Sequence, residues 1–317
     1  MSFFGGGTDY KEYYENHGGS VLSATFDKYC FVTVRDYPPF FNFRNQFTYS
    51  AIERFNSPEE LGHPLVREAF GYFNEDRLQI SYDADLPARS GIGSSSSFAV
   101  GLSNAIRTLR GQSANAYSLA RDAIILEREL CREAGGIQDQ IAAAYGGFNR
   151  INFYSDGFEV RQINVDWSIL EKLSANLLLL FSGTGHFSGE IAKEQSARIG
   201  MNTALLDEMK QMTEVAEKLL VSGKTDDFGA LMGESWLLKT RLAGNITTPL
   251  VDDIYLRAKK SGALGGKLLG AGGGGFVLLY VPEKYRAAVR SELREFMEVP
   301  FSFERQGSTI IYNSDGK

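Results

Sequence analysis

The chain has 317 residues, of which 43% are hydrophobic and 23% are charged, and its net charge at pH 7 is −6. This composition predicts a globular protein of one large or two closely packed domains. The acidic balance argues against a nucleic-acid duplex or an anionic membrane surface as a partner. No apolar run approaches the roughly 20 residues that span a bilayer. Cys30 and Cys131 lie in unrelated contexts and form neither a disulfide framework nor a zinc site, which indicates a cytoplasmic protein.

The N-terminal segment combines a short apolar run with three glycines and an aspartate. Phe3 and Phe4 are predicted to end a buried strand, and residues 5–7 allow the backbone to approach a ligand closely. Asp9 follows where a ligand would lie, and its carboxylate is suited to accept hydrogen bonds from two sugar hydroxyls. The alternative is a glycine turn in which Asp9 forms an Asx-turn.

The next part of the chain is predicted to be rich in strands. Residues 20–34 contain many β-branched and aromatic side chains, and a turn is expected at Asp27 and Lys28. By their patterns, residues 40–49 are predicted to form a strand, residues 64–74 a short helix, and residues 78–83 a strand that leads into a serine-rich segment.

That serine-rich segment, residues 86–97, has the features of an anion site. Pro87 ends the extended run, Gly91 and Gly93 let the backbone bend, and residues 94–97 are four serines that begin a predicted helix. The serines are expected to supply N-cap oxygens and unpaired amides, and the positive end of the helix dipole favours a polyphosphate. The alternative is a plain serine-capped helix, although one serine would satisfy a cap.

Two carboxylates follow in helical surroundings. Apolar residues at helical spacing between residues 117 and 130 place Glu127 near the end of a helix. Asp139 comes after Gly135 and Gly136, at the start of a small-residue helix over residues 141–145. It either caps this helix or holds a carboxylate at the lip of a pocket as a base or cation partner.

The second half of the chain is predicted to be largely helical. His186 lies on a polar glycine loop, where ligand contact and a plain surface position are equally consistent with the sequence. The remaining expectations are a hairpin over residues 148–164, a buried strand over 175–181, helices over 190–220, 226–241 and 283–297, and strands at the end of the chain.

A second glycine-rich segment lies at residues 265–275, before a predicted strand at 276–280. Five of the six residues from Gly270 to Gly275 are glycine, so this segment must pack against something that excludes side chains, either a neighbouring loop or a phosphate. It is not a Walker A motif, because no Gly-Lys-Ser/Thr ends it, and not a dinucleotide fingerprint, because a strand follows it.

Together the three motifs, residues 5–10, 87–97 and 267–275, resemble motifs one to three of the GHMP small-molecule kinases, the superfamily of galactokinase, homoserine kinase, mevalonate kinase and phosphomevalonate kinase. The resemblance covers nearly the whole chain. It implies an α+β fold of two lobes: residues 1–165 like ribosomal protein S5 domain 2, and residues 166–317 a ferredoxin-like α+β lobe. Within the superfamily, the motifs resemble bacterial sugar 1-kinases that phosphorylate D-glycero-D-manno-heptose 7-phosphate.

The resemblance also implies roles for individual residues. Asp139 would be the catalytic base, and Ser95 and Glu127 would share a magnesium ion. The residues expected to bind ATP are Pro87, Arg89, Ser90, Gly91, Ile92, Gly93, Ser94, Ser95 and Ser96. The residues expected to bind the sugar are Gly6, Gly7, Thr8, Asp9, Tyr10, His186 and Gly273, with His186 or Lys193 for a distal phosphate.

The expected reaction is attack of the anomeric C1 hydroxyl of a sugar on the γ-phosphate of MgATP, with Asp139 accepting or orienting the proton. Heptose 7-phosphate ranks ahead of a free hexose such as galactose or fucose as the small-molecule acceptor, and a homodimer is left open. In relatives an arginine precedes motif one and would fall before Met1. Either the start is truncated, or Lys11, Arg44 or Arg89 replaces it, or activity is reduced. A sugar and ATP sensor without catalysis therefore stays open, as does a structural protein whose glycines only pack.

Overall fold

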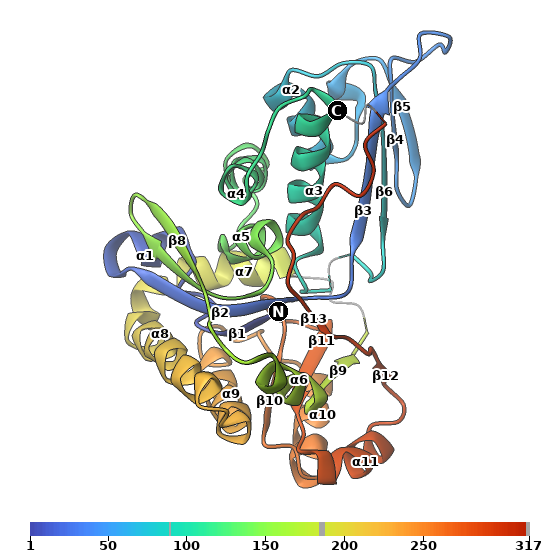
Figure 1. Ribbon diagram of the computed structural model, residues 1–317. Coiled ribbons are helices and arrows are strands. Elements are labelled where there is room, and N and C mark those ends of the chain that lie inside the picture. The colour runs from blue at the N-terminus through green and yellow to red at the C-terminus, as the bar shows by residue number, and fades with distance from the viewer. Residues whose placement is uncertain (89, 184–187, 315–317) are drawn as a thin grey trace.

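Three sheets organise the residues that the computed structural model describes, which are 1–88, 90–183 and 188–314 (Figure 1). The first sheet has the order β1 (Ser2–Phe4), β2 (Gly19–Phe26), β7 (Phe148–Tyr154) and β8 (Gly157–Gln162), and β13 (Phe303–Glu304) also pairs with β2. The second has the order β3 (Cys30–Asp36), β6 (Leu78–Ala84), β4 (Asn45–Thr48) and β5 (Ile52–Phe55). The third has the order β10 (Gly265–Leu268), β11 (Phe276–Tyr280), β9 (Leu177–Phe181) and β12 (Met297–Glu298).

Helices cover these sheets. They are α1 (Lys11–His17), α2 (Pro64–Phe73), α3 (Ser94–Leu109), α4 (Ala116–Ile124), α5 (Gln138–Tyr145), α6 (Trp167–Ala175), α7 (Ser188–Ala197), α8 (Ile199–Val221), α9 (Thr225–Lys239), α10 (Pro249–Lys260) and α11 (Glu283–Glu292). A 3-10 turn, η1 (Pro58–Glu60), and a π-helical turn, η2 (Ile125–Leu130), complete the set. Within the described ranges, no helix has the length and apolar character needed to cross a membrane. The mixture of helices and largely antiparallel sheets confirms the predicted α+β class.

The first sheet lies between two hydrophobic cores, in the middle of the molecule (Figure 1). Successive side chains of a strand point to opposite faces. Accordingly Val21 belongs to the core of the N-terminal lobe, whereas its neighbour Leu22 belongs to the core that includes the C-terminal half. On β1, the ring of Phe4 packs edge-on against Phe228 of α9, with 5.0 Å between ring centroids. The loop that follows β1, residues 5–10, which we call the motif-one loop, is therefore anchored where the two lobes meet.

The division predicted between residues 165 and 166 falls in the connection between β8 and α6. We propose it as the boundary between the lobes. The chain crosses back near its C-terminal end, because β13 pairs with β2 of the first sheet. Figure 1 shows the segment after β13 running along the N-terminal lobe beside α3, where Asn104 of α3 donates a hydrogen bond of 3.0 Å to the Ser308 hydroxyl.

Several predicted elements differ in the structure. The strand expected over residues 40–49 exists only at Asn45–Thr48, since Phe40 lies in a loop with 89% of its surface exposed and has no neighbouring strand to pair with. The helix expected over residues 283–297 ends at Glu292, because Met297 pairs with Phe181 at an edge of the third sheet. Helices α1, α6 and α10 and strands β5 and β10 were not predicted.

Candidate active site

The serine-rich segment forms a loop and the first turn of α3. Gly93 is the N-cap residue, with φ of +77°, and no side chain caps the helix, so the prediction that serines supply the cap is wrong. The left-handed conformation that Gly93 adopts is costly for any residue with a β-carbon. Because the first amides of a helix have no intrahelical acceptor, the N–H groups of Ser94, Ser95 and Ser96 remain available to an anion.

The second glycine-rich segment packs directly on the serine-rich segment, residues 86–97, which we call the phosphate loop. A β-carbon on Gly270 would collide with the Cα atom of Gly91, and one on Gly275 would overlap the carbonyl oxygen of Ser90. The prediction that these glycines pack against something that excludes side chains is confirmed, and their partner is a neighbouring loop. Gly273 has other neighbours: its amide donates to the carbonyl oxygen of Ile246, and a β-carbon on it would collide with the side chain of Ile191 of α7.

Asp139 lies in the first turn of α5 and is not its N-cap, which is Ile137. A β-carbon on Gly93 would lie 3.3 Å from the carboxyl carbon of Asp139, so this carboxylate sits against the phosphate loop. Burial raises the pKa of Asp139 and the Asp9 carboxylate raises it further, against the positive charges of the Met1 amino group and Arg128. A raised pKa suits a carboxylate that accepts a proton near neutral pH.

Glu127 is buried on the π-helical turn η2 and is held by two side chains. The hydroxyl of Ser96 donates to its Oε2 atom at 2.8 Å, and the amide of Gln140 donates to the same atom at 2.5 Å. The serine bonded to Glu127 is thus Ser96, whereas Ser95 is exposed at the start of α3. A hydroxyl and a carboxylate on facing elements are the kind of oxygen donors that Mg²⁺ binds together with substrate phosphates. In the described part of the chain no three His, Cys, Asp or Glu side chains gather as a metal site.

Asp9 joins the motif-one loop to the start of α5. Its Oδ1 atom accepts the amide of Gly7 at 2.9 Å and its Oδ2 atom accepts the amide of Gln138 at 3.2 Å. The close approach depends on Gly136, where any β-carbon would overlap the Asp9 carboxylate. Burial raises the pKa of Asp9, and the hydrogen bonds from Gly7 and Gln138 oppose that shift. Each carboxylate oxygen keeps lone-pair capacity for a further donor.

Among the expected sugar-binding residues, Thr8 holds the motif-one loop in place. It is fully buried, and its hydroxyl contacts the carbonyl oxygens of Gly5 and Ser20 at 2.8 and 2.9 Å, which corrects the expectation that it contacts sugar. By contrast, Gly7 and Tyr10 line a small cavity whose other walls come from α7, α8 and the loop after α9, namely Gln195, Ile199, Asn202, Leu206 and Leu242. Gly6 is partly exposed in the same loop.

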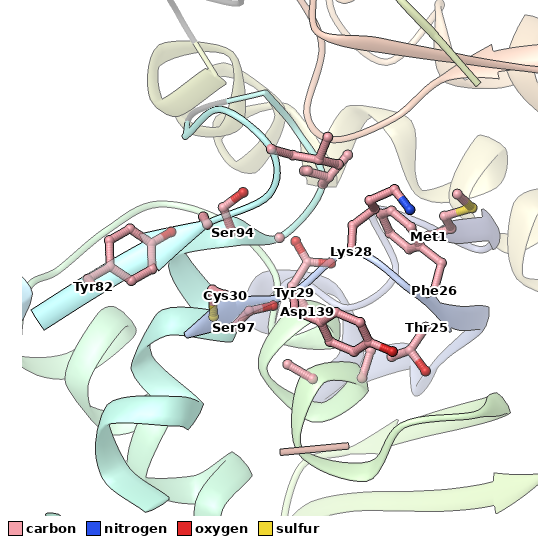
Figure 2. Close-up of a pocket in the computed structure, with 16 residues that line it drawn as sticks. Met1, Thr25, Phe26, Lys28, Tyr29, Cys30, Tyr82, Ser94, Ser97 and Asp139 are labelled. Carbon is pink, nitrogen blue, oxygen red and sulfur yellow. The ribbon is translucent and has the colours of Figure 1, made fainter. Parts of the chain in front are cut away.

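A larger pocket opens beside Asp139 and the phosphate loop. Figure 2 shows the side chains of Ser94, Ser97 and Asp139 in this pocket, with Lys28 and Tyr29 among the other residues that line it. The remaining lining residues are Met1, Thr25, Phe26, Cys30, Tyr82, Ala84, Leu86, Ile92, Gly93, Ala142 and Ala143. The pocket therefore connects the phosphate loop with a mixed polar and aromatic wall that can take a flat, uncharged group. Ser90 of the phosphate loop does not line this pocket; it is buried, and its hydroxyl donates to the carbonyl oxygen of Pro87 at 2.6 Å.

Two expected site residues, Arg89 and His186, lie outside the described residues. Three further residues lie near the candidate site and were not predicted: Gln140 bonds the Glu127 carboxylate, and the charges of Arg128 and Lys239 interact with that of Asp9. Gln140 follows Asp139 directly, so its place in the Gln-Asp-Gln pattern could have indicated that it lies near the site. Lys239 closes an otherwise apolar stretch of α9 after Trp236 and Leu238, which indicates a buried cation, although not its position.

Comparison with known proteins extends these observations. The families described as GHMP kinases N terminal domain and GHMP kinases C terminal match residues 63–147 and 216–299. The D-glycero-alpha-D-manno-heptose 7-phosphate kinase of Campylobacter jejuni is 30% identical over 326 aligned positions, which cover 97% of this chain and 95% of that protein. A crystal structure of a D-glycero-D-manno-heptose 1-phosphate kinase from Bacteroides thetaiotaomicron superposes with a TM-score of 0.79 at 23% identity and covers 99% of this chain and 97% of its own. Lactococcus lactis galactokinase complexed with galactose gives a TM-score of 0.71 at 16% identity, covering 97% and 91% of the two chains. Because both solved structures are less than 25% identical to this chain, their similarity shows a common fold.

Proposed function

The chain belongs to the GHMP kinase family, and on that premise we propose that it transfers the γ-phosphoryl group of ATP to the anomeric C1 hydroxyl of D-glycero-D-manno-heptose 7-phosphate. The observation that carries the proposal is the contact between the phosphate loop and Asp139 at Gly93. Asp139 contacts the loop that would bind the donor phosphates. A base in this position can reach an acceptor hydroxyl that attacks the γ-phosphate.

The proposed chemistry needs few groups. The first-turn amides of α3 hold the donor phosphates, and the C1 hydroxyl oxygen attacks the γ-phosphorus in line with the leaving ADP oxygen. A new bond forms between the C1 oxygen and phosphorus while the bond between phosphorus and the β,γ-bridging oxygen breaks. Asp139 takes the proton of the hydroxyl, and burial, which raises its pKa, makes it a better acceptor than an exposed aspartate.

The oxygen donors around Glu127 fit a divalent cation. We assign Ser95 and Glu127 as its ligands, with Ser96 and Gln140 holding the Glu127 carboxylate through Oε2. Bound there, Mg²⁺ would neutralise part of the charge on the phosphates. This assignment accounts for a buried carboxylate that has hydrogen-bond donors but no cationic side chain among its recorded partners in the described part of the chain.

A heptose phosphate is favoured because the Campylobacter jejuni relative is similar over nearly the full length of both chains. The motif-one loop would bind the sugar through Asp9, with Gly7 and Tyr10 bordering the cavity between the lobes. A free hexose is the second candidate acceptor, and the likeness in fold to Lactococcus lactis galactokinase supports it.

A panel assay tests this proposal. The purified protein is incubated with MgATP and, separately, with heptose 7-phosphate, galactose, fucose and mannose, and ADP release is followed. We expect ADP release above the sugar-free rate with the heptose phosphate and less with the free sugars. Thermal stabilisation by MgATP with no acceptor consumed would contradict a kinase and indicate a sugar and ATP sensor.

A further inference from the structure

Lys239, at the end of α9, is a buried cation without a carboxylate partner. Its residue surface is 7% exposed, and no ion pair recorded among residues 1–88, 90–183 and 188–314 includes it. Burying an ammonium group is costly unless other groups compensate its charge. The recorded hydrogen bond from its Nζ goes to the carbonyl oxygen of Gly270, which leaves donor capacity on a group with three N–H bonds.

The position of that carbonyl locates the ammonium group. Gly270 is the residue whose α-carbon packs against Gly91 of the phosphate loop. Burial lowers the pKa of Lys239 to about 8, and the carboxylates of Asp9 and Asp139 act in the opposite direction. Coulombic effects of this kind fall off with distance. The ammonium group therefore lies against the glycine-rich segment that packs on the phosphate loop, and the charges of Asp9 and Asp139 contribute to its electrostatic environment.

A second buried lysine shows what a structural cation looks like in this fold. Lys267 on β10 donates to the carbonyl oxygens of Ser2 and Phe3 on β1, at 2.7 and 3.0 Å, and so ties β10 to β1. Burial lowers the pKa of Lys267, and the charge of Lys239 lowers it further. Lys239 has one such carbonyl bond where Lys267 has two, so more of its N–H capacity is left for an anionic partner.

We propose that the ammonium group of Lys239 binds an oxygen of the phosphoryl group as it passes between the two substrates. The proposal rests on the phosphoryl transfer proposed above and adds a residue to it. During transfer the non-bridging oxygens remain strongly negative, and a fixed cation in a water-poor site stabilises them. Lys239 keeps its protons throughout, since the proton of the acceptor hydroxyl goes to Asp139.

The first test compares Lys239→Met, Lys239→Arg and, as a control, the exposed neighbour Arg241→Met. For K239M we expect kcat to fall at least about 10²-fold while KM for ATP changes little, because the lost contact belongs to the transition state. For K239R we expect partial recovery, because the charge remains. R241M should match the parent.

The pH profile separates a charge role from a packing role. The titratable groups whose charges act on Lys239 are Asp9 from the motif-one loop, Asp139 from α5 and Lys267 from β10. With its pKa lowered to about 8, Lys239 loses its proton as pH rises through that value, so the parent should lose kcat on the basic side. K239R should lack that decline, because a guanidinium stays charged.

A binding measurement keeps this proposal distinct from the proposed function. MgADP with aluminium fluoride mimics a phosphoryl group in transit, and its affinity is measured by calorimetry against that of MgADP alone. The parent and K239R should bind the mimic more tightly than MgADP, and K239M should lose most of that gain. If no sugar is phosphorylated by the parent, the proposed acceptor chemistry fails while this comparison still decides the role of Lys239. An equal gain in K239M and parent, or a K239M kcat within threefold of the parent, would overturn it.

Discussion

Gly93 and Asp139 lie in contact across the candidate active site, so that a β-carbon on the glycine would sit 3.3 Å from the carboxyl carbon of the aspartate. Gly93 caps α3, the helix that begins at the phosphate loop, and Asp139, the proposed base, lies in the first turn of α5. This contact joins the donor side of the site to the acceptor side.

Gly93→Ala tests that contact. The added methyl group must displace Asp139 or the loop, and the left-handed backbone at φ +77° costs about 1–2 kcal/mol for a residue with a β-carbon. Because small misplacements of reacting groups are expensive, we expect kcat/KM to fall roughly 10²-fold. The control is Gly111→Ala, whose φ is +66° but whose β-carbon meets nothing within 4 Å. Equal kcat/KM values for the two variants would contradict the functional contact.

The acid side of the pH profile tests Asp139. Burial and Asp9 raise the pKa of Asp139, so the base becomes protonated, and kcat/KM falls, at a higher pH than for an ordinary aspartate. Asp139→Asn should lower the rate at least about 10²-fold and remove this acid limb. Asp156→Asn, at the exposed tip of the β7–β8 hairpin, serves as control. If kcat/KM of D139N still fell at low pH as in the parent, the group responsible for that fall would be a residue other than Asp139.

Magnesium titrations test the cation assignment. Ser95→Ala should raise the Mg²⁺ concentration needed for half-maximal rate, since it removes a proposed ligand. Ser96→Ala should also weaken metal dependence, by about 10- to 100-fold in affinity, because it frees the Glu127 carboxylate. The matched control is Ser103→Ala, a buried serine of the same helix that bonds the Ala99 carbonyl. If all three variants respond alike to Mg²⁺, the assignment is wrong.

The interlocked glycine loops give a stability prediction. At Gly270 a β-carbon would collide with the backbone of Gly91, and overpacking of this kind costs about 1–3 kcal/mol. Gly270→Ala should therefore lower the melting temperature and raise KM for ATP, because the phosphate loop must move. Gly244→Ala, where nothing lies within 4 Å, should do neither. A G270A protein with the parent's melting temperature and KM would show that the loops do not depend on each other.

Much of the fold followed from local patterns. The two-lobed GHMP kinase fold predicted from the three motifs is confirmed by the family matches and the solved structures. Strand β10 escaped prediction because its form depends on a distant helix. A β-carbon on Gly265 would overlap the carbonyl oxygen of Gly229 on α9, so glycine is required there by close helix packing, which propensity does not record.

The sequence predicted those site residues whose local context is distinctive. It did not predict the contacts that depend on how distant elements pack together. Glu127 and Asp139 stand out by their helical and glycine contexts. The choice of Ser96 as the partner of Glu127 depends on the rotation of α3 against the π-helical turn, and four consecutive serines carry no such information. Lys239 comes from α9, about a hundred residues after Asp139, and its place beside the phosphate loop depends on its contact with Gly270, which only the packing of α9 against the second glycine-rich segment creates.

The position of the phosphate in the product tests the central claim most directly. After incubation of the protein with MgATP and D-glycero-D-manno-heptose 7-phosphate, ³¹P and ¹³C NMR should show one new phosphate at C1, one ADP per heptose, and no such product with D139N. A new phosphate on another carbon would contradict the proposed geometry of attack. No product, with MgATP bound, would contradict the kinase itself.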